Sequence, residues 1–144
     1  MSEEVRKKLL ENYGIELDIE AEFDVTLKGK IRMFRESIEI PYQRRGIYVG
    51  EMKPDGIRLN VYTAARLGRK AKKNVIEIDK ETFCKLLQGE RVAYEIEPGY
   101  YLLKLGEDFV GSVRSNGREL IPFFPKEFRS MVSCEDRLDI FVGL

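Results

Sequence analysis

The sequence predicts an α+β fold in which a small N-terminal α/β cap precedes a mixed β pseudo-barrel with short flanking helices. Three observations favour this class. The first residues place apolar side chains at helical spacing, and the next stretch alternates apolar and charged residues as a hairpin does. From Gly46 onward, six or more short strand patterns alternate with turn residues and one or two helical stretches. Closing these strands into a pseudo-barrel removes exposed sheet edges.

The N-terminal cap is predicted from two neighbouring patterns. Residues 2–13 form a helix that ends at Gly14. Residues 16–40 alternate across Lys28-Gly29, which predicts a hairpin with one solvated face. The apolar face of the helix comprises Val5, Leu9, Leu10 and Tyr13.

The first half of the barrel region is punctuated by clear turn and capping signals. Pro54-Asp55 provides turn chemistry, and Asp79 caps a helix that Gly89 ends. In chain order the predicted elements are a hairpin over residues 46–60, two helical turns over 61–68, a basic loop over 69–74 and a strand over 75–79.

The second half is predicted as strands and tight turns. A strand over 91–99 precedes a meander from Tyr100, and Asn116-Gly117 predicts a type I′ turn, which needs positive φ at both central residues. A short basic helix over 125–129 follows, and residues 137–144 are expected to return as a last strand. We therefore divide the chain into a helix-plus-hairpin cap, 1–42, and a barrel domain, 43–144.

Missing residue types exclude several catalytic classes. The chain has no histidine, which excludes histidine-dependent hydrolysis and histidine metal sites. Cys84 and Cys134 form no CxxC pair, and a buried structural role is favoured for Cys84. There is neither a GxGxxG motif nor a phosphate loop. We expect a protein that is not an enzyme and that uses no metal and no cofactor.

The composition is that of a water-soluble domain with a densely charged surface. Charged residues make up 35% of the 144 residues, and no apolar run reaches the length of a membrane span. The N-terminus does not resemble a signal peptide, so we expect a cytoplasmic protein. The abundance of Lys, Arg and Glu indicates a thermophilic source, for example an archaeon.

Charge is segregated along the chain although the formal net charge is zero. The first 24 residues carry eight acids and three bases, whereas residues 44–73 carry nine bases and two acids. Such a basic cluster is typical of phosphate binding, although a solvated loop is an equally good interpretation. The nine bases are Arg44, Arg45, Lys53, Arg58, Arg66, Arg69, Lys70, Lys72 and Lys73. Aromatic residues interleave with these cations, but at alternating strand positions we expect most of them in the core.

An ordered set of motifs resembles a known module. The strand that begins Gly46-Ile47 and ends Gly50-Glu51, the helix that ends in KLLQGE, the pair Val110-Gly111 and the close FPKEFR occur in one order. This order resembles the PUA-like RNA-binding module of the Fmu/Sun- and RsmF-type RNA cytosine-5 methyltransferases, over roughly residues 44–130. The resemblance implies a PUA-like barrel that binds RNA. It implies further candidates after the helix, namely Gly89, Glu90 and Arg91, and we expect Arg114, Lys126 and Arg129 to extend the same surface.

Two departures from the module's pattern are present. A lysine common after the hydrophobic-Gly pair is replaced by Arg114, and an asparagine before the aromatic-Pro-Lys close is replaced by Ile121-Pro122. The sequence also has no Rossmann unit and no Pro-Cys dipeptide of the kind that these methyltransferases use as nucleophile. The resemblance therefore implies a free-standing RNA-binding factor.

The predicted function is non-catalytic binding of rRNA or tRNA in ribosome biogenesis or RNA modification, beside a methyltransferase that lacks its own PUA-like domain. One alternative is a protein–protein adaptor that docks on a methyltransferase or a ribosomal protein without contacting RNA. Convergence of the basic side chains on one face would favour RNA. A small-ligand-binding or hydrolytic domain is the third alternative, and a deep pocket with paired carboxylates would favour it.

Overall fold

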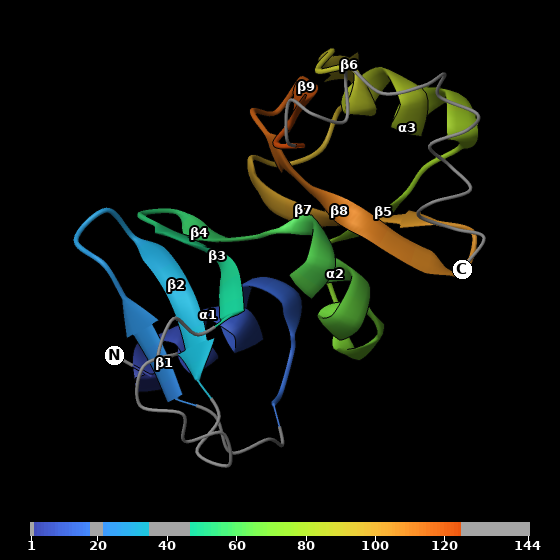
Figure 1. The fold of residues 1–144 in the computed structure, drawn as a ribbon. Coiled ribbons are helices and arrows are strands. Elements are labelled where there is room, and N and C mark those ends of the chain that lie inside the picture. The colour runs from blue at the N-terminus through green and yellow to red at the C-terminus, as the bar shows by residue number, and fades with distance from the viewer. Residues whose placement is uncertain (1, 18–21, 35–46, 125–144) are drawn as a thin grey trace.

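Two sheets organise the part of the chain that the computed structural model describes, residues 2–17, 22–34 and 47–124 (Figure 1). The first is antiparallel with strand order β1-β2-β3-β4, and α1 packs against β1 and β4. Its elements are α1 (Ser2–Tyr13), β1 (Glu22–Val25), β2 (Lys30–Phe34), β3 (Ile47–Lys53) and β4 (Gly56–Leu59).

The second sheet is a curled half-barrel with strand order β5-β7-β8-β9-β6, in which only the β5–β7 pair is parallel (Figure 1). The connection from β4 packs on β8, and α3 lies beside β6 and β9. This architecture confirms the predicted α+β class with a β pseudo-barrel. The elements are α2 (Val61–Leu67), the 3-10 turn η1 (Gly68–Lys70), β5 (Val75–Glu77), α3 (Lys80–Leu87), β6 (Val92–Ala93), β7 (Gly99–Leu105), β8 (Asp108–Ser115) and β9 (Glu119–Pro122).

Helix α1 forms because its apolar residues share one face. Val5, Leu9 and Tyr13 are fully buried, and the Tyr13 hydroxyl donates to the Ile57 carbonyl at 2.6 Å. Gly14 ends the helix with φ +68°, a conformation that glycine adopts without a Cβ clash. Leu10, which the spacing assigned to the same face, is 47% exposed because it lies at the edge of the buried stripe.

Strand β3 lies in the first sheet, not in the barrel where the sequence placed it. Its register with β2 pairs Gly50 with Ile31, so the two predicted hairpins join edge to edge. This long-range pairing had no local signal. The first sheet therefore spans the predicted boundary between residues 1–42 and 43–144, and that boundary stays a prediction.

Strand β7 connects the cores of the two halves. Tyr101, Leu103 and Leu105 face the barrel core with α3, whereas Tyr100 and Leu102 face the core formed by α1, β2 and β4. A strand buried on both faces needs a continuous apolar run, which is why residues 100–103 do not alternate with polar ones.

Two further expectations are corrected by the backbone. Asn116 does not adopt positive φ, so the β8–β9 turn is not type I′; the Asn116 Oδ1 atom accepts from the amides of Arg118 and Glu119 instead. The strand predicted over 91–99 is only β6, because pairing with β9 covers two residues. The predicted helix 125–129 and final strand 137–144 lie outside the described residues.

Candidate nucleic-acid interface

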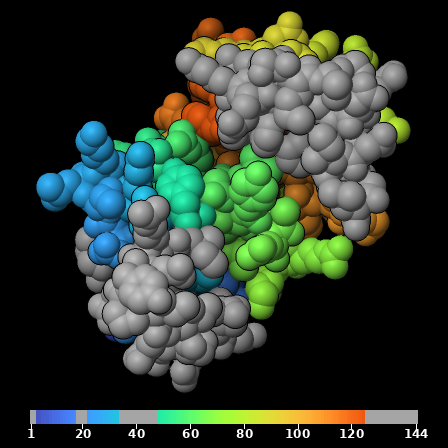
Figure 2. All heavy atoms as spheres, viewed as in Figure 1, coloured from blue at the N-terminus to red at the C-terminus, as the bar shows by residue number. Residues whose placement is uncertain are grey.

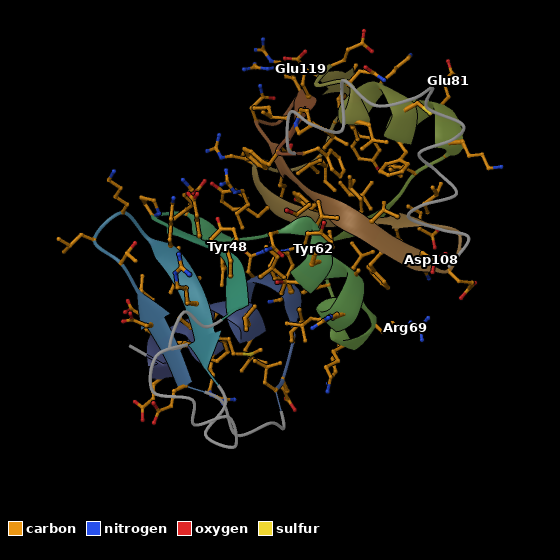
Figure 3. All side chains as sticks on the ribbon, in the orientation of Figure 1. Tyr48, Tyr62, Arg69, Glu81, Asp108 and Glu119 are labelled. Carbon is orange, nitrogen blue, oxygen red and sulfur yellow. The ribbon has the colours of Figure 1, made fainter. Side chains whose placement is uncertain are left out.

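The segment from α2 to β5 presents five exposed cations, which we call the basic ridge: Arg66, Arg69, Lys70, Lys72 and Lys73. Asn60 starts α2, its Oδ1 atom accepting from the Thr63 amide at 2.8 Å. A Cβ at Gly68 would lie 2.2 Å from the Phe109 ring, so glycine lets this segment sit directly on β8. Figure 2 shows the segment, in green, at the surface, and Figure 3 shows Arg69 pointing away from the body.

The C-terminal end of α1 fixes the loop that carries Lys72 and Lys73. Both of their amides donate to the Tyr13 carbonyl, at 2.8 and 3.2 Å. The Asn74 side chain donates to the Asn12 carbonyl, and Asn74 itself has φ +58°, which asparagine tolerates better than most residues. The N-terminal helix therefore sets the position of the basic loop.

Four of the five ridge cations are not neutralised by the described residues. Within the described residues, no carboxylate oxygen lies within 4.0 Å of the charged nitrogens of Arg66, Arg69, Lys72 or Lys73. Uncompensated, exposed cations at one edge of the molecule favour a polyanionic partner.

Lys53 and Arg58, which the sequence grouped with the ridge, instead surround Glu51. The Glu51 carboxylate lies 2.8 Å from both cations, and the Arg58 guanidinium stacks over the Phe123 ring at 4.4 Å. Partial burial opposes ionisation of Glu51, but hydrogen bonding to Lys53 and the charge of Arg58 hold the pKa of its carboxyl below the ordinary value. These cations act as internal counter-ions.

Arg114 is also engaged within the protein. Its Nη2 atom lies 2.9 Å from the Asp55 carboxylate in the β3–β4 turn, which ties the first sheet to β8. Hydrogen bonding to Arg114 lowers the pKa of Asp55, and the same bond raises the pKa of Arg114. Arg114, which replaces a lysine of the module's pattern, is therefore paired with Asp55 in the structure.

A groove of about 610 Å³ begins at the loop end of the ridge. Lys72 and Lys73 line one part of it, with the edge strand β5 along its length. Tyr94 and Lys104 also line the groove, and neither was among the residues predicted from the sequence. Lys104 lies on β7 and Tyr94 follows β6, and local sequence patterns do not show that these two segments line one groove. The available signal was an aromatic residue in a stretch too irregular for a strand.

The family model for the PUA domain of methyltransferase RsmF matches residues 73–130. The match supports a PUA-like domain in this segment, similar to that of the methyltransferase family. No protein in a search of curated proteins matches the chain. The match begins with β5 and covers the whole five-stranded sheet. The earlier strand motif, from Gly46 to Glu51, lies before the matched residues.

Two motif elements of the PUA-like domain meet in the structure. The Phe124 ring lies against Gly111, where an added Cβ would lie 2.7 Å from the ring. The glycine of the Val110-Gly111 pair therefore leaves the space that the aromatic residue of the closing motif occupies. Phe124 also packs edge-on against Phe83 of α3, with ring centroids 5.7 Å apart. Phe124 is buried, as expected of a core aromatic.

The remaining predicted contacts of the PUA-like domain are separate from the ridge or outside the described residues. Gly89 follows α3 with φ +88°, Glu90 is exposed, and Arg91 lies 3.9 Å from the Glu119 carboxylate near β6. Four predicted residues lie outside the described part of the chain: Arg44, Arg45, Lys126 and Arg129.

The described residues include one cysteine and one small pocket lined by acids. Cys84 packs against the barrel core and is disulfide-bonded. The sequence did not reveal this bond, although the chain has an even number of cysteines. Cys134 lies outside the described residues. A pocket beside α1 is lined by Glu11, Asp55 and Glu97, but its volume is only about 260 Å³ and Asp55 is engaged by Arg114. In the described ranges, no acid or cysteine cluster suits a metal ion.

None of the three helices described is long and apolar enough to cross a bilayer.

Proposed function

We propose that this protein binds rRNA or tRNA through the basic ridge and serves RNA modification or ribosome assembly without catalysing a reaction itself. The observation that carries the proposal is that four exposed cations, Arg66, Arg69, Lys72 and Lys73, have no carboxylate partner in the described residues and lie where the match to a PUA domain begins. Phosphates would replace the missing counter-ions, because exposed cations bind a nucleic-acid backbone by releasing its condensed ions. An RNA methyltransferase is the proposed protein partner, and the cytoplasm the proposed location.

The structure divides the predicted cations in a way that sharpens the proposal. Lys53, Arg58 and Arg114 already have carboxylate partners, so binding RNA there would require breaking ion pairs at 2.8–2.9 Å. Binding at the four ridge cations other than Lys70 breaks no ion pair with a described carboxylate. We therefore assign phosphate binding first to Arg66, Arg69, Lys72 and Lys73.

The test is fluorescence-anisotropy titration of labelled tRNA and rRNA fragments over a range of salt concentrations, with a DNA duplex as comparison. Replacing Arg69, Lys70, Lys72 and Lys73 with Ala is expected to weaken RNA binding at least about tenfold. If each of the four meets one phosphate, the slope of log affinity against log salt falls by roughly 3 for single strands.

A matched control removes the same charge elsewhere: Lys7, Lys28, Lys30 and Lys80 are exposed cations on α1, the first hairpin and the start of α3. This variant is expected to bind RNA nearly as the wild type does. Equal losses in both variants would show that net charge, not the ridge, governs binding. No RNA binding by the wild-type protein at low salt would favour the adaptor function.

A further inference from the structure

Strand β5 offers unpaired backbone groups to the groove. It is the end strand of its sheet, and it pairs with β7 through the Asn74 carbonyl and the Ile78 amide. Because pairing groups alternate along a parallel strand, the N–H and C=O of Ile76 also face β7, and those of Val75 and Glu77 face the groove. No described residue bonds to these four outward groups.

The opposite wall carries an aromatic ring. Tyr94 is 37% exposed and lines the groove together with Ile96. Its amide donates to the Arg118 carbonyl at 2.8 Å, which extends the β6–β9 pairing by one residue and fixes the base of the side chain. An aromatic face opposite a free donor–acceptor edge is the arrangement that recognises an unpaired base, by stacking and by hydrogen bonds.

The charges around the groove favour an anion. Lys72, Lys73 and Lys104 line it against one acid, Glu77, whose side chain is 80% exposed and lies 3.8 Å from Lys104. Two of these lysines belong to the basic ridge, so a backbone bound on the ridge leads directly to the groove. A phosphate beside Lys72 and Lys73 leaves its base within the volume between β5 and Tyr94.

We propose that this groove binds one unpaired nucleotide of a single-stranded RNA segment, with its base against Tyr94 and its hydrogen-bonding edge on the backbone of Val75 and Glu77. The inference rests on the proposed RNA-binding function and adds its substrate class, single-stranded RNA. A duplex is rejected, because its bases already use their Watson–Crick edges. A protein strand that pairs with β5 is less favoured than RNA for two reasons. Only two residues of β5 face outward, and an uncharged strand would offer no anion to the lysines that line the groove.

The experiment compares short homopolymeric RNA strands of uridine and of adenosine with an RNA duplex of equal length, by anisotropy at fixed salt. Tyr94→Ala is expected to weaken single-strand binding about tenfold, the scale of one base–aromatic stack, and to leave duplex binding unchanged. Tyr94→Phe keeps the ring and restores binding. The control is Tyr62→Ala, which removes a ring that is 69% exposed on α2 and does not line the groove.

A second readout follows the edge strand directly. In amide NMR spectra, adding the uridine or adenosine strand is expected to shift the Val75 and Glu77 amides more strongly than the inward-facing Ile76 amide. Equal affinity of Tyr94→Ala and wild type, or a loss confined to Tyr62→Ala, overturns the groove site even when RNA binding remains salt-dependent.

Other outcomes separate the two proposals. Salt-dependent binding that favours the duplex retains the ridge and overturns the groove. Absence of binding by every RNA overturns both. Shifts at Val75 and Glu77 with an extended peptide, and none with RNA, show that the edge accepts a protein strand instead.

Discussion

Two groups of cations lie close together along the chain but in different surroundings. Lys53 and Arg58 share the Glu51 carboxylate, and Arg58 lies over an aromatic ring. A few residues later, the cations of the basic ridge are exposed, and those on either side of Lys70 have no carboxylate partner in the described residues. The difference teaches that a run of basic residues is not a binding site until the acids that the fold brings to it are known.

The largest expected effect is on stability, and it comes from comparing one arginine of each group, Arg58 beside Glu51 and Arg66 on the basic ridge. Arg58→Ala removes the ion pair with Glu51 and the stacking on Phe123, and is expected to lower the free energy of unfolding by about 2 kcal/mol with RNA affinity unchanged. Arg66→Ala is expected to change stability by less than about 0.5 kcal/mol and to weaken RNA binding. Urea denaturation and anisotropy measure both; the opposite pattern would reverse the assignment.

A smaller effect tests whether the ridge needs its anchor. Asn74→Ala loses the hydrogen bond to the Asn12 carbonyl and places alanine at φ +58°, for an expected cost of about 1 to 2 kcal/mol in unfolding free energy. RNA binding should weaken although no charge is lost. Asn74→Gly is the control, because it removes the same bond without the backbone strain. Unchanged RNA affinity in both variants would mean that a loosely held loop binds equally well.

The Glu51 group should reveal itself through pH. The folded pKa of Glu51 lies below its ordinary value of 4.5, so its stabilisation is complete above that pH and is lost as the pH falls through the folded pKa. Glu51→Gln is therefore expected to be less stable than wild type at neutral pH, with the difference shrinking in acid. Thermal unfolding from neutral pH to pH ~3 measures this window; a constant difference would assign the effect to packing.

The smallest effect belongs to the ion pair that joins the first sheet to β8. The side chains of Asp55 and Arg114 are 44% and 37% exposed, so solvent screens their attraction. Arg114→Ala is expected to lower the free energy of unfolding by about 0.5 kcal/mol and to leave RNA affinity unchanged. A clear loss of RNA affinity would return Arg114 to the binding surface.

Most individual elements were predictable because their signals are local. Asp79 caps α3 through the Thr82 amide at 2.8 Å, and glycines end α1 and follow α3 at positive φ. The turn at Asn116 was placed correctly but given the wrong type, because its side chain accepts two amides that a residue pattern does not specify. Partial success at such turns reflects the competition between side-chain and backbone hydrogen bonds.

The candidate site was only partly predictable. The ridge cations follow from charge density, whereas Tyr94 and Lys104 join them only because β7 pairs with β5 and the segment after β6 faces the same groove. The ion pair of Glu51 with Arg58 is different, because the two residues lie opposite each other in the β3–β4 hairpin, and the turn signal at Pro54-Asp55 was a local indication of that pairing. Contacts between distant segments depend on sheet order, which local periodicity does not encode.

The sequence by itself determined the helices, the hairpins and the α+β class, since capping, turn and periodicity signals act within a few residues. Tertiary structure alone decided that β3 joins β2, that β7 is buried on both faces, and which cations are neutralised. The physical reason is that the Asp55–Arg114 ion pair and the shared groove depend on distances between side chains far apart in the sequence, and those distances are set by long-range strand pairing.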